Sequence, residues 1–311
     1  MSDEIPDFQS TLAQANRKKM AKPKLVTRLL KLALLLIVLG FATWGYMKFE
    51  ARWLTVDSID LPNEKFPVRR SFRILHLSDF HFSDNVPLSY IEESIVLGLR
   101  KKADVCFITG DFITTKISDD DFAKYVKVLG KLTEEVPTFA CLGNHDGGKW
   151  SNSANGYSNT ERVEELLQEA KIGLLENERR VIYVKGQPLA LVGLGDIWNQ
   201  RCFPDKCLRK KSEGGSAQNP PTIILSHNPD SKAFLSEHEW NLMLCGHTHG
   251  GQCKIPFLGY APFAPVKDHD YLEGLHTWED RLIHISRGVG NLHGLRFNCR
   301  PQVCILEAKA P

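Results

Sequence analysis

Polar residues of the kinds that bind metal ions follow five short apolar runs of this chain, each at the point where the run ends. Short runs rich in branched and aromatic residues, separated by helix-like stretches, are typical of buried strands in an α/β fold. An ordered series of five such strand ends is hard to obtain by chance and indicates a metal site. The residues at these ends are Asp79 and His81; Asp111; Asn144 and His145; His227; and His247 and His249.

The apolar pattern also predicts the order of the secondary-structure elements. In the first half of the domain, most of the expected strands alternate with amphipathic stretches, which favours an α/β architecture. Strands are expected at 72–78, 105–109, 138–142, 189–194, 222–226, 242–245 and 282–286, and helices at 88–101, 119–135, 160–171 and 230–238.

The spacing within the motifs suits metal binding. Asp79 and His81 are two residues apart, as are His247 and His249, and residues i and i+2 of an extended segment project to the same side. Each motif alone has a simpler explanation, since an aspartate after a strand is usually a turn former and a lone histidine usually a hydrogen-bonding residue. The five motifs together favour the metal site.

These motifs carry a resemblance to a known family. The chain resembles the calcineurin-like metallophosphoesterase superfamily through five motifs over residues 72–308. In order, these motifs are D-x-H, G-D, G-N-H-D, H and G-H-T-H. The chain is similar to the bacterial membrane-anchored branch of this superfamily in three segments, GHTHGGQ, SRGVGN and RFNCRP. That branch includes lipid-related phosphodiesterases and a UDP-2,3-diacylglucosamine pyrophosphatase of the lipid A pathway. The resemblance implies a four-layer αββα sandwich of two mixed β-sheets, here with an N-terminal membrane-anchor helix.

The resemblance also implies a role for each motif residue. It implies two divalent metal ions that share Asp111, and His145 as the catalytic histidine. Mixed oxygen and nitrogen ligands suit Mn²⁺, with Fe or Zn²⁺ as alternatives. A hydroxide bridging the two ions is then expected to attack phosphorus. The ligands of one ion would be Asp79, His81, Asp111 and His249, and those of the other Asp111, Asn144, His227 and His247.

Three residues of the Gly-rich closing segment are candidates for substrate binding. Arg287, Asn291 and Arg296 are of the types that bind phosphate oxygens. An ordinary surface ion pair is an equally good explanation for each arginine. The apolar stretch 255–266 is expected either to line an acyl-chain groove or to enter a membrane interface, with a buried strand and loop as the alternative.

The N-terminal region predicts a membrane anchor. Leu32 to Met47 contains no charged residue and follows a basic cluster between Arg17 and Lys31, which favours an uncleaved anchor over a signal peptide or a core helix. The expected division is a polar basic tail at 1–24, an anchor helix at 25–53, a linker at 54–71 and a metallophosphoesterase domain at 72–311.

The net charge and the cysteines limit where the protein can be located and what it can bind. The chain carries +2 overall, and outside the basic cluster its charge is net negative, so the domain lacks the footprint of a nucleic-acid binder. The inner membrane is the expected location. The positive-inside rule places the N-terminus in the cytosol. The cysteines in apolar runs favour a reducing compartment for the domain. The side of the membrane that the domain faces therefore stays open. No obligate protein partner is inferred.

The expected function is hydrolysis of a phosphodiester or pyrophosphate bond in an amphiphilic or nucleotide-linked substrate at the membrane. UDP-2,3-diacylglucosamine, cleaved to 2,3-diacylglucosamine 1-phosphate and UMP, is the specific substrate that the resemblance favours. The alternatives are a general phosphodiesterase and a non-catalytic metal-binding scaffold.

Overall fold

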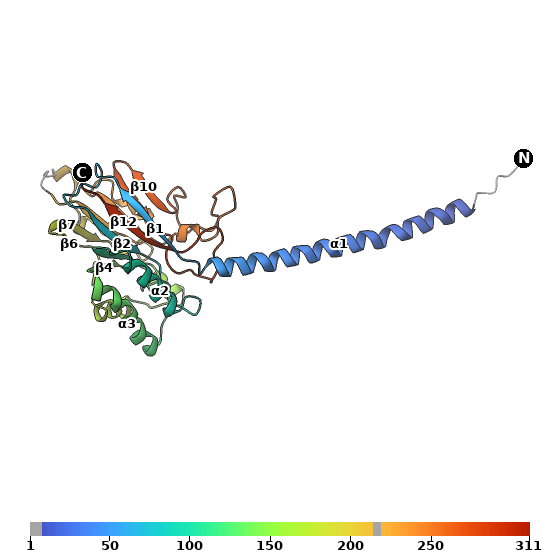
Figure 1. Cartoon of the computed structure of the whole chain (residues 1–311), viewed down its shortest axis with the longest axis horizontal. Helices are drawn as coiled ribbons and strands as arrows, with labels where there is room; N and C mark the ends of the chain where they lie inside the picture. Colours follow the sequence, from blue (N-terminus) through green and yellow to red (C-terminus); the bar gives the residue numbers. More distant parts are fainter. Residues whose placement is uncertain (1–7, 214–218) are drawn as a thin grey trace, which may run out of the picture. The chain divides into compact units, whose positions relative to one another are not determined.

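The computed structural model describes residues 8–213 and 219–311, which divide into two compact units at Met47. The first unit is most of helix α1 (Phe8–Glu50), whose segment Leu25–Glu50 is long and apolar enough to cross a membrane and is not buried against protein (Figure 1). The helix begins at Phe8 rather than at the expected anchor boundary, so it includes most of the predicted tail. Residues 1–7 of that tail lie outside the described residues.

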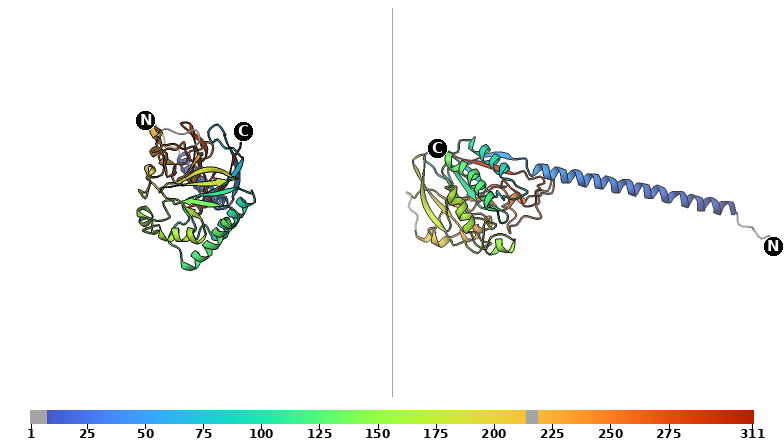
Figure 2. Two further views of the ribbon diagram at one scale, coloured as in Figure 1. Left: turned by 90° about the vertical axis from the view of Figure 1, so that its left-hand side faces the viewer. Right: turned by 90° about the horizontal axis from the view of Figure 1, so that it is seen from below.

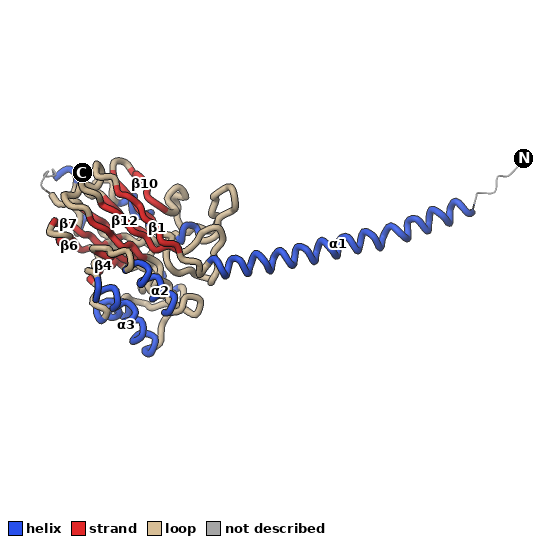
Figure 3. The backbone as a smooth tube through the Cα atoms, in the orientation of Figure 1, coloured by secondary structure: helices blue, strands red, loops and turns tan. Residues whose placement is uncertain are grey.

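The second unit contains two mixed β-sheets, drawn in red in Figure 3. Strand order is β1-β12-β2-β3-β4-β5 in the first sheet and β10-β11-β9-β8-β7-β6 in the second. Within the first sheet, β2, β3, β4 and β5 are parallel neighbours, and in the second β7, β8, β9 and β11 are parallel neighbours. The strands are β1 (Thr55–Leu61), β2 (Phe72–Leu77), β3 (Val105–Thr109), β4 (Thr138–Cys141), β5 (Gly173–Leu174), β6 (Glu178–Val184), β7 (Gln187–Gly193), β8 (Thr222–Leu225), β9 (Leu242–Cys245), β10 (Gly274–Trp278), β11 (Arg281–Ile285) and β12 (Gln302–Ala308).

The core lies between the two sheets. Phe107 of β3, Leu191 of β7, Leu244 of β9 and Leu306 of β12 belong to one fully buried apolar cluster to which both sheets contribute. Burying such side chains contributes about 1.5–3 kcal/mol each, which makes the packing of the two sheets the main source of stability. A buried pair of histidines also joins the sheets, because His76 of β2 and His284 of β11 place their Nδ1 atoms 2.9 Å apart.

Helices cover the outer face of the first sheet, and shorter segments cover that of the second. Helices α2 (Leu88–Leu99), α3 (Asp119–Glu135) and α5 (Glu161–Glu169) pack on the first sheet (teal to yellow-green in Figures 1 and 2). The 3₁₀ helices η1 (Pro204–Lys206) and η3 (Pro229–Phe234), with the residues next to them, cover the second. The helix expected at 230–238 is thus the short η3. The remaining elements are α4 (Lys149–Ser153), η2 (Lys211–Glu213) and η4 (His249–Gly251).

The linker expected at 54–71 is in part a strand of the domain. Strand β1 pairs in parallel with β12 along its whole length, from Thr55 opposite Gln302 to Leu61 opposite Ala308. The prediction was wrong here because β1, TVDSIDL, is an edge strand that alternates polar and apolar residues and therefore lacks the apolar run of a central strand.

The cysteines expected in buried strands lie there. Cys106 in β3, Cys141 in β4 and Cys245 in β9 are fully buried and pack as small apolar side chains. All eight cysteines belong to the described part of the chain, and all are free thiols.

Candidate metal centre

Loops that follow parallel strands of both sheets supply the candidate ligands. Asp79 comes after β2, Asp111 after β3 and Asn144 after β4, all in the first sheet. His227 comes after β8 and His247 after β9, in the second sheet. The carboxyl ends of parallel strands are the usual position of a site in α/β proteins, and here two sheets contribute to one site.

Unusual backbone geometry marks these loops. The structure places five of the seven candidate ligands at positive φ: Asp79, His81, Asp111, His247 and His249, with values between 49° and 69°. Residues other than glycine rarely adopt this conformation, and it is found at functional sites, where the surrounding structure holds it in place.

Two glycines give the ligand loops the room to approach one another. A Cβ atom on Gly143 would collide with Oδ1 of Asp111, and one on Gly246 would collide with Ser78 and Asp79. The glycine at each position is therefore required by the close approach of a candidate ligand.

The first group of candidate ligands is Asp79, His81 and His249, all buried and with ligand atoms close enough to share one ion. Nε2 of His249 lies 3.1 Å from Nε2 of His81 and 3.7 Å from Oδ1 of Asp79. A cation bound by both ring nitrogens would replace the hydrogen bond that they can form at this distance. The three side chains thus fit a metal ion.

Asp111 joins this group to a second one. Its Oδ2 lies 3.2 Å from Nε2 of His81 and 3.2 Å from Nε2 of His227. Nε2 of His227 in turn lies 3.1 Å from Oδ1 of Asn144 and 3.2 Å from Nδ1 of His247. A carboxylate in this central position can be shared by two cations and offset their repulsion.

Hydrogen bonds on the far side of each ring orient the histidines. Nδ1 of His227 donates to the carbonyl of Thr109 at 2.7 Å, and Nε2 of His247 donates to the carbonyl of Pro265 at 3.1 Å. Nδ1 of His81 lies 3.2 Å from the hydroxyl of Thr114. Such bonds fix the tautomer in which the other ring nitrogen presents its lone pair to a metal.

The charge states of most groups in the cluster suit a cation. Burial, together with the neighbouring His227, lowers the pKa of His247 to about 3, and burial lowers the pKa of His249 and of His81. Burial opposes ionisation of Asp111, but His227 and other histidines hold its pKa well below the ordinary value. Neutral imidazoles beside an ionised carboxylate are the protonation states that metal binding requires. His227 is the exception, because Asp111 raises its pKa to about 10 against the effect of burial, and a metal ion would have to displace its proton.

Asp146 shapes the turn that carries Asn144. Its carboxylate accepts the backbone N–H groups of Asp111 at 2.8 Å, Phe112 at 2.7 Å and Gly143 at 2.8 Å. The carboxylate binds the β3 loop to the β4 loop and so sets the position of Asn144 relative to Asp111.

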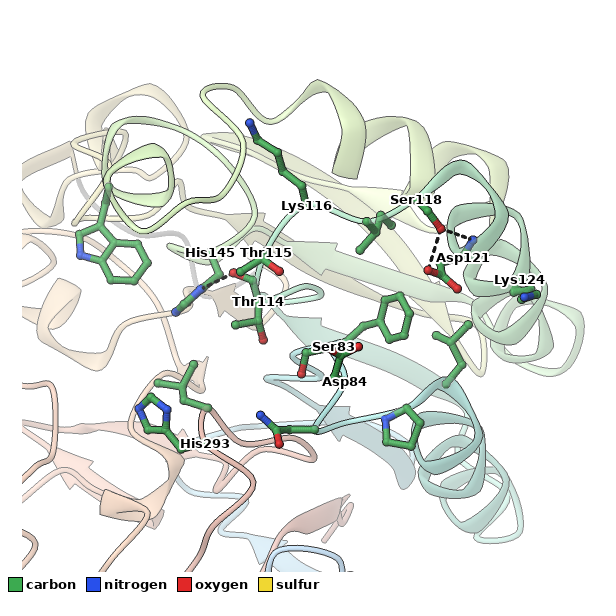
Figure 4. Close-up of a pocket in the computed structure, with 17 residues that line it drawn as sticks. Ser83, Asp84, Thr114, Thr115, Lys116, Ser118, Asp121, Lys124, His145 and His293 are labelled. Atoms are coloured by element: carbon green, nitrogen blue, oxygen red, sulfur yellow. Dashed lines mark hydrogen bonds between the residues drawn. The ribbon is translucent and has the colours of Figure 1, made fainter.

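His145 lies at the edge of the cluster, between the ligands and a cleft. Its ring centroid is 4.8 Å from that of His81, and its Nδ1 donates to the carbonyl of Thr114 at 3.1 Å. The side chain lines a cleft of about 960 Å³, with His293 at the same end and Lys124 at the other (Figure 4). His145 is therefore the candidate that contacts both the metal ligands and the space for a substrate.

Three further residues of the site were not found from the sequence. Trp150 packs edge-on against His145 at 4.6 Å, Trp198 packs edge-on against His247 at 4.4 Å, and the two indoles contact each other at 5.3 Å. Asp196 is buried, which raises its pKa to about 6, and its Oδ2 has no hydrogen-bond partner among the described residues. Asp196 and Trp198 follow β7, as the ligands follow the other parallel strands, and this position was the signal available in the sequence.

Residues 72–251, more than half of the chain, match the calcineurin-like phosphoesterase family. The chain belongs to this family. It is 43% identical over 236 residues to phosphodiesterase YaeI of Escherichia coli (strain K12), covering 76% of this chain and 82% of that protein. It is 26% identical to UDP-2,3-diacylglucosamine pyrophosphatase LpxG of Chlamydia muridarum (85% and 92%) and 28% identical to the uncharacterized metallophosphoesterase YkoQ of Bacillus subtilis (89% and 97%).

Family membership confirms the predicted fold and the predicted class of activity. The chain is a metallophosphoesterase, a hydrolase of a family that uses divalent metal ions. The seven candidate ligands come together in the structure as described above. Their individual roles, and the identity of the metals, stay predictions.

Of the three residues expected to bind substrate, the two arginines contact protein groups, and the substrate role of all three stays a prediction. Arg287 forms ion pairs with Asp57 at 2.8 Å and with Glu273 at 3.6 Å. An ion pair was the alternative that the sequence left open for this arginine. Arg296 is fully buried and donates to the carbonyl oxygens of His249 and Arg287.

Asn291 is buried as well, and its Oδ1 has no hydrogen-bond partner among the described residues. The expected contact with a substrate phosphate is not supported for either arginine, because its guanidinium is already bound. Arg296 instead fixes the loop that carries His249.

Proposed function

We propose that this metallophosphoesterase hydrolyses a phosphodiester or pyrophosphate bond in an amphiphilic substrate at a membrane. The observation that carries the proposal is the position of the metal-ligand cluster beside two adjoining cavities of different character. His145 lines a cleft that has both polar and apolar side chains, and His249 lines an apolar cavity. A substrate with a polar head and an apolar chain fits this arrangement.

The cleft beside His145 offers groups that suit a phosphorylated head. Lys116 and Lys124 supply positive charge beside the carboxylates of Asp84 and Asp121, and Thr114 and Ser118 supply hydroxyl groups. Phosphate oxygens accept hydrogen bonds from such groups, and lysine pairs with phosphate as a point charge. The volume of about 960 Å³ is large enough for a nucleotide or a sugar phosphate.

The apolar cavity offers a place for an acyl chain. It measures about 360 Å³ and is lined by Leu292, Leu295, Pro265 and Phe263 beside His249. Leu292 also lines the cleft beside His145, so the two cavities meet at this residue. Burying a methylene group in such a cavity contributes about 0.8 kcal/mol, which favours a substrate with a hydrocarbon chain.

The most specific substrate that we propose is UDP-2,3-diacylglucosamine, cleaved to 2,3-diacylglucosamine 1-phosphate and UMP. The similarity to LpxG along 85% of this chain supports it, as do the two cavities. The higher identity to phosphodiesterase YaeI supports a second candidate, a general phosphodiesterase activity.

The chain's own residues have distinct tasks in this reaction. Divalent cations, which we propose to be Mn²⁺ on the basis of the mixed oxygen and nitrogen ligands, supply Lewis-acid activation of water and neutralise phosphoryl charge when bound. Asp79, His81, Asp111 and His249 would hold one ion, and Asp111, Asn144, His227 and His247 the other. His145 is placed to hydrogen-bond a phosphoryl oxygen or to protonate the leaving oxygen through Nε2, because its Nδ1 is bound to Thr114. Trp150 and Trp198 exclude water from one side.

We also propose that the apolar part of α1 anchors the chain in the inner membrane. Leu25–Glu50 has a mean hydropathy of 2.2 and is exposed from Leu25 to Tyr46, as a helix surrounded by lipid would be. An anchor of this kind raises the local concentration of a lipid substrate at the domain.

A substrate panel tests the proposed function. The full-length protein in detergent is stripped with a chelator and then supplied with Mn²⁺. Bis-p-nitrophenyl phosphate and UDP-2,3-diacylglucosamine are offered in parallel, and release of UMP is followed for the second. We expect metal-dependent turnover of both. Turnover of only the small diester excludes the proposed lipid substrate, and turnover of neither favours a non-catalytic scaffold.

A further inference from the structure

The loop at residues 255–263 presents apolar side chains to solvent. Phe257 is fully exposed, Phe263 is 80% exposed and Leu258 is 75% exposed. The sequence contains no charged residue between Ile255 and Val266. The alternative of a buried strand and loop, considered from the sequence, is therefore excluded. A folded protein in water rarely leaves so many large apolar side chains together at one exposed site without a function.

The loop has a defined shape that presents these side chains. The N–H of Ile255 donates to the carbonyl of Tyr260 at 2.8 Å, and the N–H of Gly259 donates to the carbonyl of Ile255 at 3.2 Å, so the turn is closed by its own backbone. Phe257 adopts a φ of 67°, which is unfavourable for a bulky residue. The closed turn thus holds the side chain of Phe257 in solvent.

The base of the loop lies beside the segment through which the chain joins the domain, residues 48–53. The backbone N–H of Asn298 donates to the carboxylate of Glu50 at 2.9 Å. The preceding residue, Phe297, accepts the N–H of Lys254 at 2.9 Å, at the base of the loop. One backbone–backbone hydrogen bond and one bond to the Glu50 carboxylate thus connect the loop to the end of the apolar helix segment within the domain unit. The loop is coloured orange in Figure 1, and the segment 48–53 is blue.

The junction segment 48–53 itself has the composition of a membrane interface. Phe49 and Trp53 are exposed by 59% and 45%, and their rings contact each other at 5.3 Å. Lys48 and Arg52 add positive charge beside them. Aromatic rings with flanking basic residues are enriched at the headgroup level of membranes, and basic residues are attracted to anionic lipids.

We propose that loop 255–263 is a second membrane contact, which inserts Phe257, Leu258 and Phe263 into the interfacial region of a lipid bilayer. This inference rests on the proposed membrane anchoring of the chain. Phe263 also lines the apolar cavity beside His249. The inserted loop would therefore place the mouth of that cavity at the lipid surface, where an acyl chain can pass from the bilayer to the metal centre without crossing water.

Fluorescence of a tryptophan at the loop tip tests the insertion. Full-length protein carrying Phe257→Trp is reconstituted in vesicles of phosphatidylcholine and phosphatidylglycerol, with and without brominated acyl chains. The matched control is Tyr183→Trp on β6, an aromatic position that is 72% exposed and lies at the opposite edge of the second sheet from β10. The emission of the unsubstituted protein is subtracted from both spectra.

We expect the added emission of Phe257→Trp to be quenched at least about two-fold by the brominated lipid, as for a side chain at the interface. The emission from Tyr183→Trp should not change. Equal, unquenched emission from the two variants overturns the proposal. So does retention of the protein by the vesicles with the loop probe still in water, because the helix alone would then hold the chain.

A second measurement asks what the contact does for catalysis. The double variant Phe257→Ser/Leu258→Ser should lose about ten-fold in turnover of UDP-2,3-diacylglucosamine embedded in vesicles, since two apolar contacts with lipid are removed. Its turnover of soluble bis-p-nitrophenyl phosphate should equal that of the unsubstituted protein. Equal loss with both substrates overturns the proposal, because the loop would then act on the site itself. If the unsubstituted protein hydrolyses neither substrate, the proposed function fails, while the quenching result still decides the insertion.

Discussion

Asp146 offers a quantitative test of how the two ligand loops are held together. Replacing it with alanine leaves the N–H groups of Asp111, Phe112 and Gly143 without their acceptor in a buried site. A buried donor without a partner costs about 1–3 kcal/mol. Allowing for water that enters the vacated space, we expect a loss of about 4 kcal/mol in the free energy of unfolding.

The assay is thermal unfolding of the metal-free, full-length protein in detergent, followed by circular dichroism. A loss of this size lowers the midpoint by about 10 °C in a domain of this length. The matched control is Asp120→Ala, which removes an exposed carboxylate paired with Lys124 and should change stability by about 0.5 kcal/mol or less. A midpoint for Asp146→Ala within about 2 °C of the unsubstituted protein would refute the reasoning. The carboxylate would then serve catalysis rather than the turn.

Three further predictions concern other buried groups. His145→Asn should retain its metals, measured by elemental analysis, but lose about 10²–10⁴-fold in turnover, because Nε2 no longer transfers a proton or binds the phosphoryl group; metal loss would contradict this. Burial lowers the pKa of His284 to about 3 from an unfolded value near 6.5, so its contribution to stability is complete above pH 6.5 and is lost on acidification toward pH 3. When the pH is lowered from 7 to 5, the free energy of unfolding of His284→Asn should therefore fall by about 2 kcal/mol less than that of the unsubstituted protein. The free energy of unfolding of the exposed control His269→Asn should fall by as much as that of the unsubstituted protein. Arg296→Met should lower metal content, because the guanidinium that joins the carbonyl of His249 to the carbonyls of Arg287 and Gly290 is lost, and unchanged metal content would argue against this role.

The central elements could be read from the sequence because they are apolar on both faces. The expected ranges of β3 (Val105–Thr109), α3 (Asp119–Glu135) and β9 (Leu242–Cys245) agree with the structure residue by residue. Ser118 caps α3 by accepting the N–H of Asp121, a local signal that needs no tertiary information.

All four edge strands were missed, for one physical reason. β1, β5, β6 and β10 lie at the edges of the sheets, where one side of the strand is open to solvent and polar residues are tolerated. β6, for example, begins Glu-Arg-Arg and is largely exposed. Strand β12 was also missed, although its apolar run Val303–Leu306 is buried and was visible in the sequence.

The residues of the candidate site were likewise predicted only in part from the sequence. The candidate ligands were found because each motif is local and follows a recognisable strand. Trp150 was not found because it lies in a Gly-, Ser- and Asn-rich stretch, a composition typical of surface loops, and only tertiary packing brings it to His145. Asp57, the ion-pair partner of Arg287, and His249, whose carbonyl Arg296 binds, are likewise distant in sequence and could not be inferred from composition.

Metal content and turnover of Asp111→Asn test the central claim most directly. Oδ2 of Asp111 lies 3.2 Å from a histidine of each ligand group, and the substitution removes the charge that both cations would share. The full-length variant and the unsubstituted protein are stripped with chelator, supplied with Mn²⁺, and assayed for bound metal and for hydrolysis of bis-p-nitrophenyl phosphate. We predict two ions and turnover for the unsubstituted protein, and neither for the variant. An Asp111→Asn protein that binds both ions and turns over at the original rate would contradict a metal centre built around this residue.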